Sequence, residues 1–293
     1  MNQRIFSLKC ILIFWGVFFP LIFIQADLKN SGLFQDGDYI KYDIHWSLLK
    51  IGTAELRFTE AQLNKDKELN ICFTVETNEI VNSIYPVENK VKSTLSFPEL
   101  NPIKYRKQLN ERHDKNDILI TFDWDKRILQ KTKDGQAEKP FKLLENTLDP
   151  LSLILSLCQN NFSSKRTLKQ KVTDGGPIVE IEATYQSDLQ LKTPRGYFDT
   201  RKISVSTKEL KGIFKKSPKA EVLLYLTKET PSIPIKLRSK VVVGHFDATL
   251  SEGLYQGKPI KGTWAETHPT KNLVDPRYDR LRLSPKYRGF KKR

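Results

Sequence analysis

The sequence contains little sulfur and few histidines. Three cysteines, one methionine and four histidines occur among its 293 residues. So few cysteines exclude a small fold that is held together by many disulfide bonds. The histidines and cysteines form neither a His-Glu-x-x-His pair nor a Cys-x-x-Cys cluster, so their spacing predicts no metal site and no metal cofactor.

Motifs for covalent catalysis and phosphate binding are also missing. The chain has no Gly-x-Ser-x-Gly nucleophile elbow, and its one Gly-Gly turn does not open a helix, as a phosphate loop would. An acid–base site would pair His45 or His245 with a carboxylate such as Asp247 across a sheet, but a solvated or hydrogen-bonded histidine is the simpler interpretation. We therefore expect no catalytic residues, no cofactor and no enzymatic activity.

Long apolar runs are scarce, and the one that stands out lies near the N-terminus. Arg4 and Lys9 precede the apolar stretch Ile11–Ile24, and Ala26 follows it shortly afterwards. A basic segment, an apolar segment and a small residue in this order are typical of a secretory signal peptide. We expect residues 1–26 to be a signal peptide cleaved near Ala26, with an uncleaved anchor as the alternative. The protein is then exported to the periplasm or cell envelope.

The positive charge of the chain is unevenly distributed. Its 49 Lys+Arg and 34 Asp+Glu give a net charge of +15. Residues 1–26 carry +2 and residues 258–293 carry +8, which leaves +5 for residues 27–257. The middle of the chain is therefore close to balanced, and its charge does not predict a polyanionic partner.

The C-terminal segment, residues 258–293, lacks periodicity and is predicted to be a basic, disordered tail. Export removes nucleic acid as a partner, so anionic lipids or envelope polymers are the polyanions that such a tail would meet. The tail could act as an electrostatic tether with peripheral membrane contact. It could equally be a solubilising tail without a specific partner. The basic residues near its end are Arg277, Arg280, Arg282, Lys286, Arg288, Lys291, Lys292 and Arg293.

Alternation of apolar and polar residues dominates the rest of the chain. In one run, Ile40, Tyr42 and Ile44 alternate with polar residues, which predicts a strand with one apolar face. The predicted strands are 40–46, 54–58, 71–75, 87–97, 101–110, 118–124, 127–132, 179–185, 197–206, 220–228, 233–243 and 245–255. The predicted turns are 50–52, 98–102, 134–135, 174–177 and 194–196. We expect antiparallel pairing within a single β-rich domain over residues 27–257.

One segment, residues 149–160, has helical features. Asp149 is a good N-cap, Pro150 suits the first helical position, and leucine and isoleucine cover most of the helix that follows. A helix this apolar belongs in a protein interior. The predicted fold is mainly β, with a large curved antiparallel sheet, an open or half barrel, packed on this one buried helix.

Several short motifs along the chain resemble, in order and spacing, the uncharacterised bacterial family called domain of unknown function 3108. The resemblance spans roughly residues 36–251. It implies an exported envelope protein without an established activity. Around Pro194 the chain departs from the family pattern, which we expect to change a loop surface. The motifs are Gly37-Asp38-Tyr39, Gly52-Thr53-Ala54, Ser83-Ile84-Tyr85-Pro86-Val87, Asp149-Pro150-Leu151-Ser152, Asp174-Gly175-Gly176, Pro194-Arg195-Gly196-Tyr197-Phe198 and Ile233-Pro234-Ile235-Lys236.

These features predict a non-enzymatic binding scaffold. The apolar helix and the one-sided strands would give the sheet a concave apolar face that holds an apolar or lipid-like ligand, although the same features also suit a filled core. The candidate ligand contacts are Trp46, Tyr85, Leu153 and Leu157. The alternative is a cell-surface interaction or assembly factor that its tail tethers to anionic envelope polymers. The composition does not predict an oligomeric state.

Two cysteines leave alternatives open. Cys72 alternates onto the polar side of its strand, whereas Cys158 lies late in the predicted helix. In an oxidising compartment the two thiols could form a disulfide bond if the fold brings their Cα atoms to within roughly 4.4–6.8 Å. Two inert thiols are the other possibility.

Overall fold

The computed structural model describes residues 34–63, 66–97, 99–162, 167–206, 222–240 and 244–264. The predicted signal peptide, residues 1–26, and the basic residues between 277 and 293 lie outside these ranges. Strands predominate, and none of the helices in the described ranges is long and apolar enough to cross a membrane.

Seventeen strands and two helices make up the described part of the chain. The helices are α2 (Glu79–Asn82) and α3 (Pro150–Gln159). The strands are β1 (Tyr39–Trp46), β2 (Leu49–Leu63), β3 (Asp66–Thr77), β4 (Glu88–Phe97), β5 (Pro102–Glu111), β6 (Asp114–Asp123), β7 (Ile128–Lys133), β8 (Gln136–Ala137), β9 (Phe141–Lys142), β10 (Thr147–Leu148), β11 (Thr167–Val172), β12 (Val179–Thr193), β13 (Gly196–Val205), β14 (Val222–Thr227), β15 (Pro234–Lys240), β16 (His245–Tyr255) and β17 (Lys258–Pro259).

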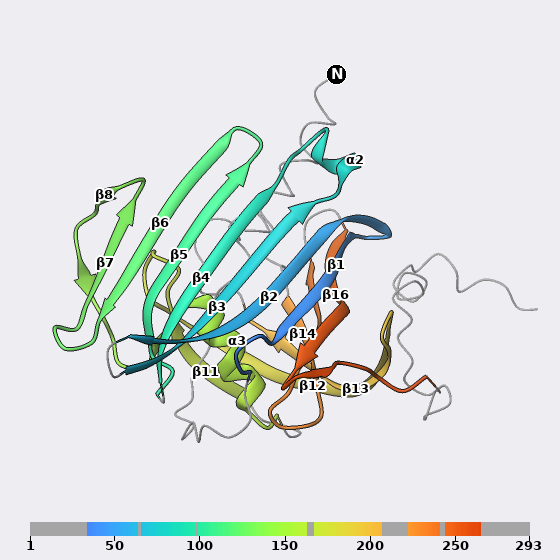
Figure 1. The fold of residues 1–293 in the computed structure, drawn as a ribbon. Helices are drawn as coiled ribbons and strands as arrows, with labels where there is room; N and C mark the ends of the chain where they lie inside the picture. The colour runs from blue at the N-terminus through green and yellow to red at the C-terminus, as the bar shows by residue number, and fades with distance from the viewer. Residues whose placement is uncertain are drawn as a thin grey trace, which may run out of the picture.

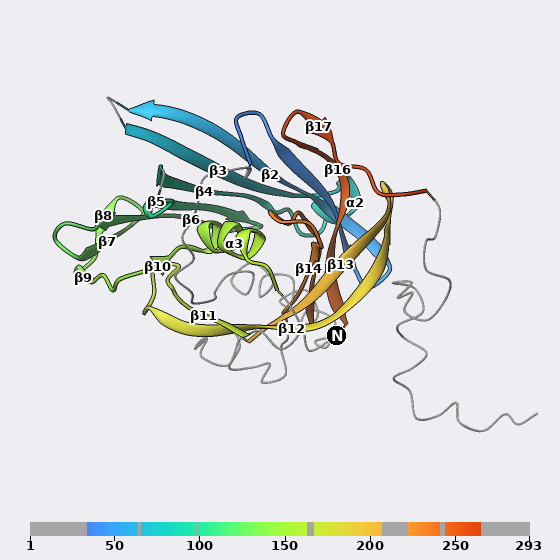
Figure 2. The ribbon, with the colours of Figure 1, turned by 90° about the horizontal axis from the view of Figure 1, so that it is seen from below.

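All of these strands belong to one sheet. Its hydrogen-bonded neighbours follow the order β10-β11-β12-β13-β14-β15-β16-β1-β2-β3-β4-β5-β6-β7, with β17 on β16 and with β8 and β9 on β7. Every pair except β10–β11 is antiparallel. The sheet curves strongly, so that β2–β6 form one layer and β11–β12 the opposite layer (Figures 1 and 2). The prediction of a mainly β fold with a large curved sheet is therefore confirmed.

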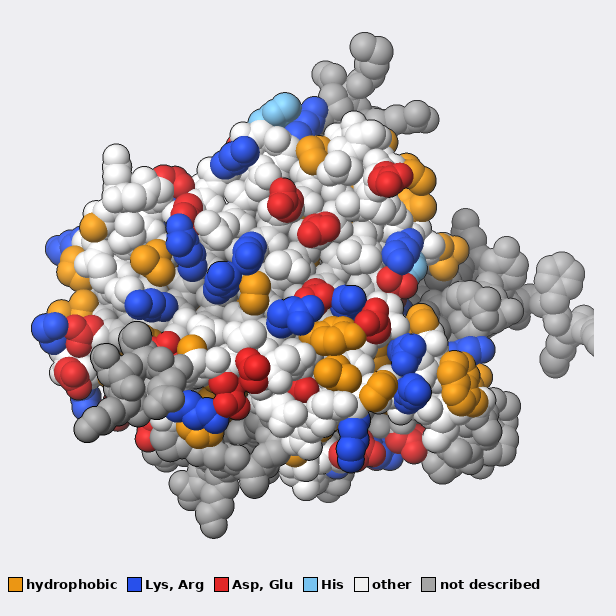
Figure 3. Space-filling view, in the orientation of Figure 1, with side chains coloured by type: hydrophobic (Ala, Val, Ile, Leu, Met, Phe, Trp, Pro, Cys, Tyr) orange, Lys and Arg blue, Asp and Glu red, His pale blue; other side chains and the backbone are white. Residues whose placement is uncertain are grey.

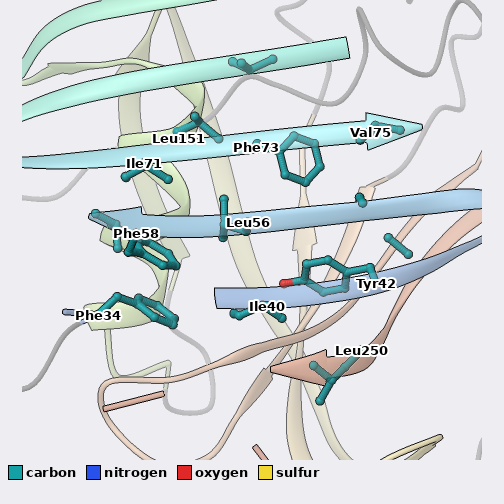
Figure 4. Close-up of a cluster of buried hydrophobic side chains, with 14 of the residues drawn as sticks. Phe34, Ile40, Tyr42, Leu56, Phe58, Ile71, Phe73, Val75, Leu151 and Leu250 are labelled. Atoms are coloured by element: carbon teal, nitrogen blue, oxygen red, sulfur yellow. The ribbon is translucent and has the colours of Figure 1, made fainter. Parts of the chain in front are cut away.

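The alternation read from the sequence determines which side of each strand faces the interior. Ile40, Tyr42 and Ile44 of β1 are buried in one apolar cluster with side chains of β2, β3 and β16. The rings of Phe34 and Phe58 stack there, with centroids 4.0 Å apart (Figure 4). The opposite face of β2–β6 carries lysine, arginine and acidic side chains intermixed (Figure 3). The curved sheet thus has an apolar inner side and a charged outer side.

Gly52 has a different role from the one predicted. Residues 50–52 were expected to form a turn, but they lie inside β2, and the chain turns at Ser47 and Leu48 instead. A Cβ atom on Gly52 would lie 2.1 Å from the Glu76 carbonyl oxygen of the neighbouring strand. Glycine is therefore needed there because the two backbones approach closely, not because the chain reverses.

Helix α3 lies inside the curve of the sheet (Figure 2). Asp149 caps it, because its carboxylate accepts hydrogen bonds from the backbone N–H groups of Leu151 and Ser152 at 2.7 and 3.0 Å. Ser93 of β4 donates a third bond to the same carboxylate at 2.6 Å. Leu151 and Leu155 belong to the first apolar cluster, which includes side chains of β1–β7 and β12–β16. Leu153 and Leu157 belong to a second cluster with side chains of β11–β14. The cap thus joins the helix to the sheet.

The chain beyond residue 257 corrects one predicted boundary. The tail was expected to begin at residue 258, yet β17 pairs with β16, Ile260 is buried, and Thr263 forms a bridge with Tyr197. The hairpin between β16 and β17 is too short to produce a visible alternation. Residues 258–263 therefore belong to the folded domain.

Candidate functional site

A pocket of about 490 Å³ opens between the β1–β2 turn, the β12–β13 turn and strands β15 and β16. This volume is within the range of small-molecule sites. We call it the β1–β16 pocket. Its lining residues are Asp43, His45, Ser47, Leu48, Lys192, Thr193, Pro194, Lys236, Asp247 and Thr249.

Strand alternation and register bring these side chains together. Phe246, Ala248 and Leu250 of β16 point into the apolar interior, so Asp247 and Thr249 lie on the opposite, outer face. Across β16, Asp247 is the register partner of His45 on one side and of Arg238 on the other, while Thr249 faces Lys236. Directly opposed residues on antiparallel strands share a face, so strands distant in sequence form one polar surface.

Two lining residues of one pocket wall, Lys236 and Asp247, form a buried ion cluster with Arg238, which bonds to Asp247 without lining the pocket. Arg238 donates through Nε to Asp247 Oδ1 at 2.7 Å and through Nη2 to Oδ2 at 2.9 Å. Lys236 Nζ lies 2.8 Å from the same Oδ2. The side chains of Lys236, Arg238 and Asp247 are only 2%, 7% and 6% exposed, so water screens these contacts weakly.

The cluster keeps Asp247 ionised. Burial by itself would raise the pKa of this carboxyl, because a low-dielectric surrounding disfavours the charged form. The hydrogen bond from Arg238 and the charges of Lys236 and Arg238 outweigh that effect and lower the pKa below its ordinary value. The wall of the pocket therefore carries fixed charges of both signs at neutral pH.

The histidine–carboxylate pair considered from the sequence lies at this site. His245 Nε2 is 3.6 Å from Asp247 Oδ2, which is longer than an ordinary hydrogen bond. His45 is the cross-strand partner of Asp247 and lines the pocket. Because Arg238 holds the Asp247 carboxylate through both oxygens, the arrangement differs from a triad in which the carboxylate orients a histidine.

The rim of the pocket is held by close backbone contacts and one ion pair. Asp43 Oδ1 lies 2.7 Å from Lys50 Nζ. Ser47 has a φ of 59°, and its backbone N–H donates to the His245 carbonyl at 2.8 Å. A Cβ atom on Gly244, whose φ is 82°, would lie 2.7 Å from Ser47 Oγ, so glycine is required at this approach.

The charges at the pocket favour an anionic group. In the described chain, Lys50, Lys192, Lys236 and Arg238 line the pocket or bond to its lining, against the carboxylates of Asp43 and Asp247. The hydroxyls of Ser47 and Thr249 add donors. No group of three side chains suited to bind a metal ion occurs in the described ranges.

The four ligand contacts predicted from the sequence do not form one site. Trp46 packs beside the first apolar cluster and stacks on Phe246, with ring centroids 6.4 Å apart. Tyr85 is buried in the same cluster, whereas Leu153 and Leu157 belong to the second one. Lys236 and Arg238 were not among the predicted site residues, because lysine and arginine in a strand usually lie in solvent.

Cys72 and Cys158, the two cysteines of the described residues, are free. Cys158 is buried in the second apolar cluster, and burial raises the pKa of its thiol. Cys72 is half-buried in β3, where its register partners are Arg57 of β2 and Lys92 of β4. Its neighbours in β3, Ile71 and Phe73, are buried and face the interior. Cys72 and Cys158 do not form a disulfide bond, because alternation places Cys72 on the outer face of the sheet and Cys158 lies inside it.

Comparison with known proteins adds the family and the fold. No curated protein matches the chain. A beta-barrel-like protein of domain of unknown function DUF1849 from Brucella abortus has a similar fold, with a TM-score of 0.50 and 8% identity over 76% of this chain and 99% of that chain. The family described as "Protein of unknown function (DUF3108)" matches residues 41–251. The chain therefore belongs to the DUF3108 family.

Proposed function

We propose that this protein is an exported, non-enzymatic binding protein of the cell envelope. Its ligand is lipid-like, with an anionic head group, and binds in the β1–β16 pocket. The observation that carries the proposal is a pocket of about 490 Å³ with the buried Lys236–Arg238–Asp247 cluster in its wall. Export is proposed from the predicted signal peptide, residues 1–26.

The polar part of the lining supports recognition of an anionic head group. Lys192 is exposed near the end of β12, so its side chain can change conformation to contact a ligand. The Lys236 side chain, in contrast, is held in place by its ion pair with Asp247. Charge-assisted hydrogen bonds from lysine are stronger than those between neutral groups. The hydroxyls of Ser47 and Thr249 complete a set of donors around the space.

The apolar part of the lining supports an aliphatic body. Leu48 and Pro194 line the pocket from the two turns that border it, and Leu48 is largely exposed. A ligand that covers Leu48 removes apolar surface from water, which favours binding. A head group alone would leave this side of the pocket unused.

We prefer a binding role to catalysis because the carboxylate that would assist a histidine base is already held by two cations. The Asp247 carboxylate is held by Arg238 and Lys236, and the His245 ring nitrogen lies 3.6 Å from it. In a catalytic triad the carboxylate orients the histidine, whereas here both carboxylate oxygens bond to Arg238. The cluster is better suited to hold charge in place than to move a proton.

The test measures binding of a fluorescent fatty-acid probe and its displacement by laurate or by the neutral glycerol monoester of lauric acid. We expect laurate to displace the probe at lower concentration than the ester does. Lys192→Gln should weaken laurate binding about fivefold, the effect of losing one partly exposed charge-assisted contact. Thr249→Phe, which fills the pocket, should abolish binding.

Lys169→Gln is the matched control, because Lys169 lies on β11 and bonds to Glu182 at 2.9 Å away from the pocket lining. It should bind laurate as the unaltered protein does. Equal weakening in Lys192→Gln and Lys169→Gln, or full binding in Thr249→Phe with an unchanged melting temperature, would exclude the β1–β16 pocket. Absence of probe binding in every variant would refute the lipid-like ligand.

A further inference from the structure

Exposed aliphatic side chains gather at one end of the sheet. Leu48 in the β1–β2 turn and Leu49 at the start of β2 are 63% and 57% exposed. Ile80 in α2 and Ile84 just after it are 75% and 63% exposed. We call these four residues the apolar tip. The other exposed large hydrophobic residues of the described chain are Trp264, which is 80% exposed, and Ile128, which is 36% exposed.

The two loops of the apolar tip are fastened to each other. Asn78 donates through Nδ2 to the Lys50 carbonyl at 2.6 Å and through its backbone N–H to the Ile51 carbonyl at 2.9 Å. Its side-chain oxygen also accepts a bond from Val81, which caps α2. In Figure 1, α2 lies beside the β1–β2 turn. The four side chains are therefore held on one preformed end of the molecule.

We propose that the apolar tip docks on a lipid bilayer. Apolar side chains on protruding turns can enter the interface between head groups and acyl chains, where burial of their surface drives binding. Figure 3 shows hydrophobic side chains along the edge of the molecule near α2 and the β1–β2 turn. This edge is the part of the surface that meets the bilayer.

Composition and area favour a bilayer over a protein partner. Protein interfaces depend on buried aromatic and arginine anchors, and the apolar tip is made only of leucine and isoleucine. Full burial of such side chains removes roughly 60–120 Å² each, so four of them supply well under the ~800 Å² per partner of a stable protein interface. A bilayer needs no such minimum area.

The apolar tip also adjoins the proposed ligand site. Leu48 belongs to the tip and at the same time lines the β1–β16 pocket. Docking of the tip therefore brings the mouth of the pocket to the lipid surface. This inference goes beyond the proposed ligand, and it can be true or false whether or not the pocket binds laurate.

The test compares sedimentation of the exported protein with phosphatidylcholine vesicles, which carry no net charge and so do not attract the basic tail. Leu49→Glu combined with Ile80→Glu removes half of the apolar tip without touching the pocket lining. We expect at least about a tenfold loss of vesicle binding, because two buried aliphatic side chains are lost and two charges are introduced.

Ile128→Glu is the matched control, since Ile128 is exposed at the start of β7, in the hairpin with β6. It should bind vesicles like the unaltered protein, and all variants share the same termini. Equal vesicle binding by the double variant and the unaltered protein would overturn the proposal, as would failure of the unaltered protein to bind. Self-association that is lost in the double variant, without vesicle binding, would assign the tip to a second copy instead.

Discussion

Two buried aspartates of the described chain, Asp149 and Asp247, are stabilised in opposite ways. Inside the curved sheet, Asp149 accepts hydrogen bonds from the Ser93 hydroxyl and from backbone N–H groups at the start of α3. On the outer face, Asp247 bonds to Arg238 and Lys236. Burial raises the pKa of Asp149 to about 6, whereas the two cations lower the pKa of Asp247 despite its burial.

The opposite pKa shifts show that the Asp149 carboxyl has a structural role, whereas the Asp247 carboxylate supplies a permanent charge beside the pocket. Neutral donors satisfy the Asp149 oxygens and position α3, but they do not fully compensate for removing a negative charge from water. Two cations do compensate for the burial of Asp247, so this lining residue of the β1–β16 pocket stays negatively charged. The interior site can accept a proton near neutral pH, and the outer cluster cannot.

Removing the shared carboxylate of the outer cluster should have the largest effect. Asp247→Asn leaves Lys236 and Arg238 buried without the negative charge that holds both. The free energy of unfolding should fall by about 3–5 kcal/mol, the usual result of breaking a buried ion pair from one side. Urea unfolding measures it.

An exposed ion pair provides the control for that variant. Asp188 Oδ2 lies 2.8 Å from Lys228 Nζ, with both side chains at least 40% exposed. Asp188→Asn should change stability far less, because water screens this pair. Similar losses in Asp188→Asn and Asp247→Asn would show that burial does not strengthen the outer cluster.

The inner carboxyl should make stability depend on pH. Its folded pKa of about 6 exceeds the ordinary value of 3.8, so between these values the folded state binds the proton more tightly than the unfolded chain does. Stability therefore falls as the pH rises from about 4 to about 6, by up to about 3 kcal/mol, and the loss is complete above that interval. Asp247 has the opposite sign, and its contribution is lost only below about pH 3.8.

Asp149→Asn isolates this dependence, because asparagine is also a good N-cap but carries no charge. Urea unfolding of both proteins across pH 3.5–7.5 should show a difference that grows between about pH 4 and 6 and then levels off. Other titrating groups contribute equally to both proteins. Parallel pH profiles would show that Asp149 does not titrate in this interval.

The contrast also explains what the sequence could and could not predict. Asp149-Pro150 marked the helix start because capping depends on adjacent residues. The alternation of residues 40–46 predicted which side chains of β1 face inward. The pocket depends on the register that places Asp247 between His45 and Arg238, and on a turn near Lys192 that folds toward β16. No local pattern encodes the pairing of His45 with Asp247 across about 200 positions, so the pocket could not be found from the sequence. Lys236 and Arg238 lie in the hairpin next to Asp247, but lysine and arginine in a strand usually lie in solvent.

A smaller effect is expected from the link between α3 and the sheet. Ser93→Ala removes the 2.6 Å hydrogen bond to Asp149. The variant should lose about 2 kcal/mol at pH 7.5, where the carboxyl is ionised, since a buried hydrogen bond to a charged group is broken. The bond lowers the pKa of Asp149, so its loss should move the pH transition upward. A stability loss that is equal at pH 4 and pH 7.5 would contradict this account.

The smallest effect should come from a second fork-shaped ion pair. Arg106 Nε donates to Asp117 Oδ1 at 2.8 Å and its Nη2 contacts Oδ2, as in the Arg238–Asp247 pair, but these side chains are 48% and 39% exposed. Double-mutant cycles with Arg→Gln and Asp→Asn at both pairs compare equal chemistry at different burial. The exposed pair should give a small coupling energy that disappears in high salt, and the buried pair a much larger one that persists, because salt screens only what water reaches. Equal coupling energies in the two cycles would mean that fork geometry, and not burial, determines the strength of the Arg238–Asp247 ion pair.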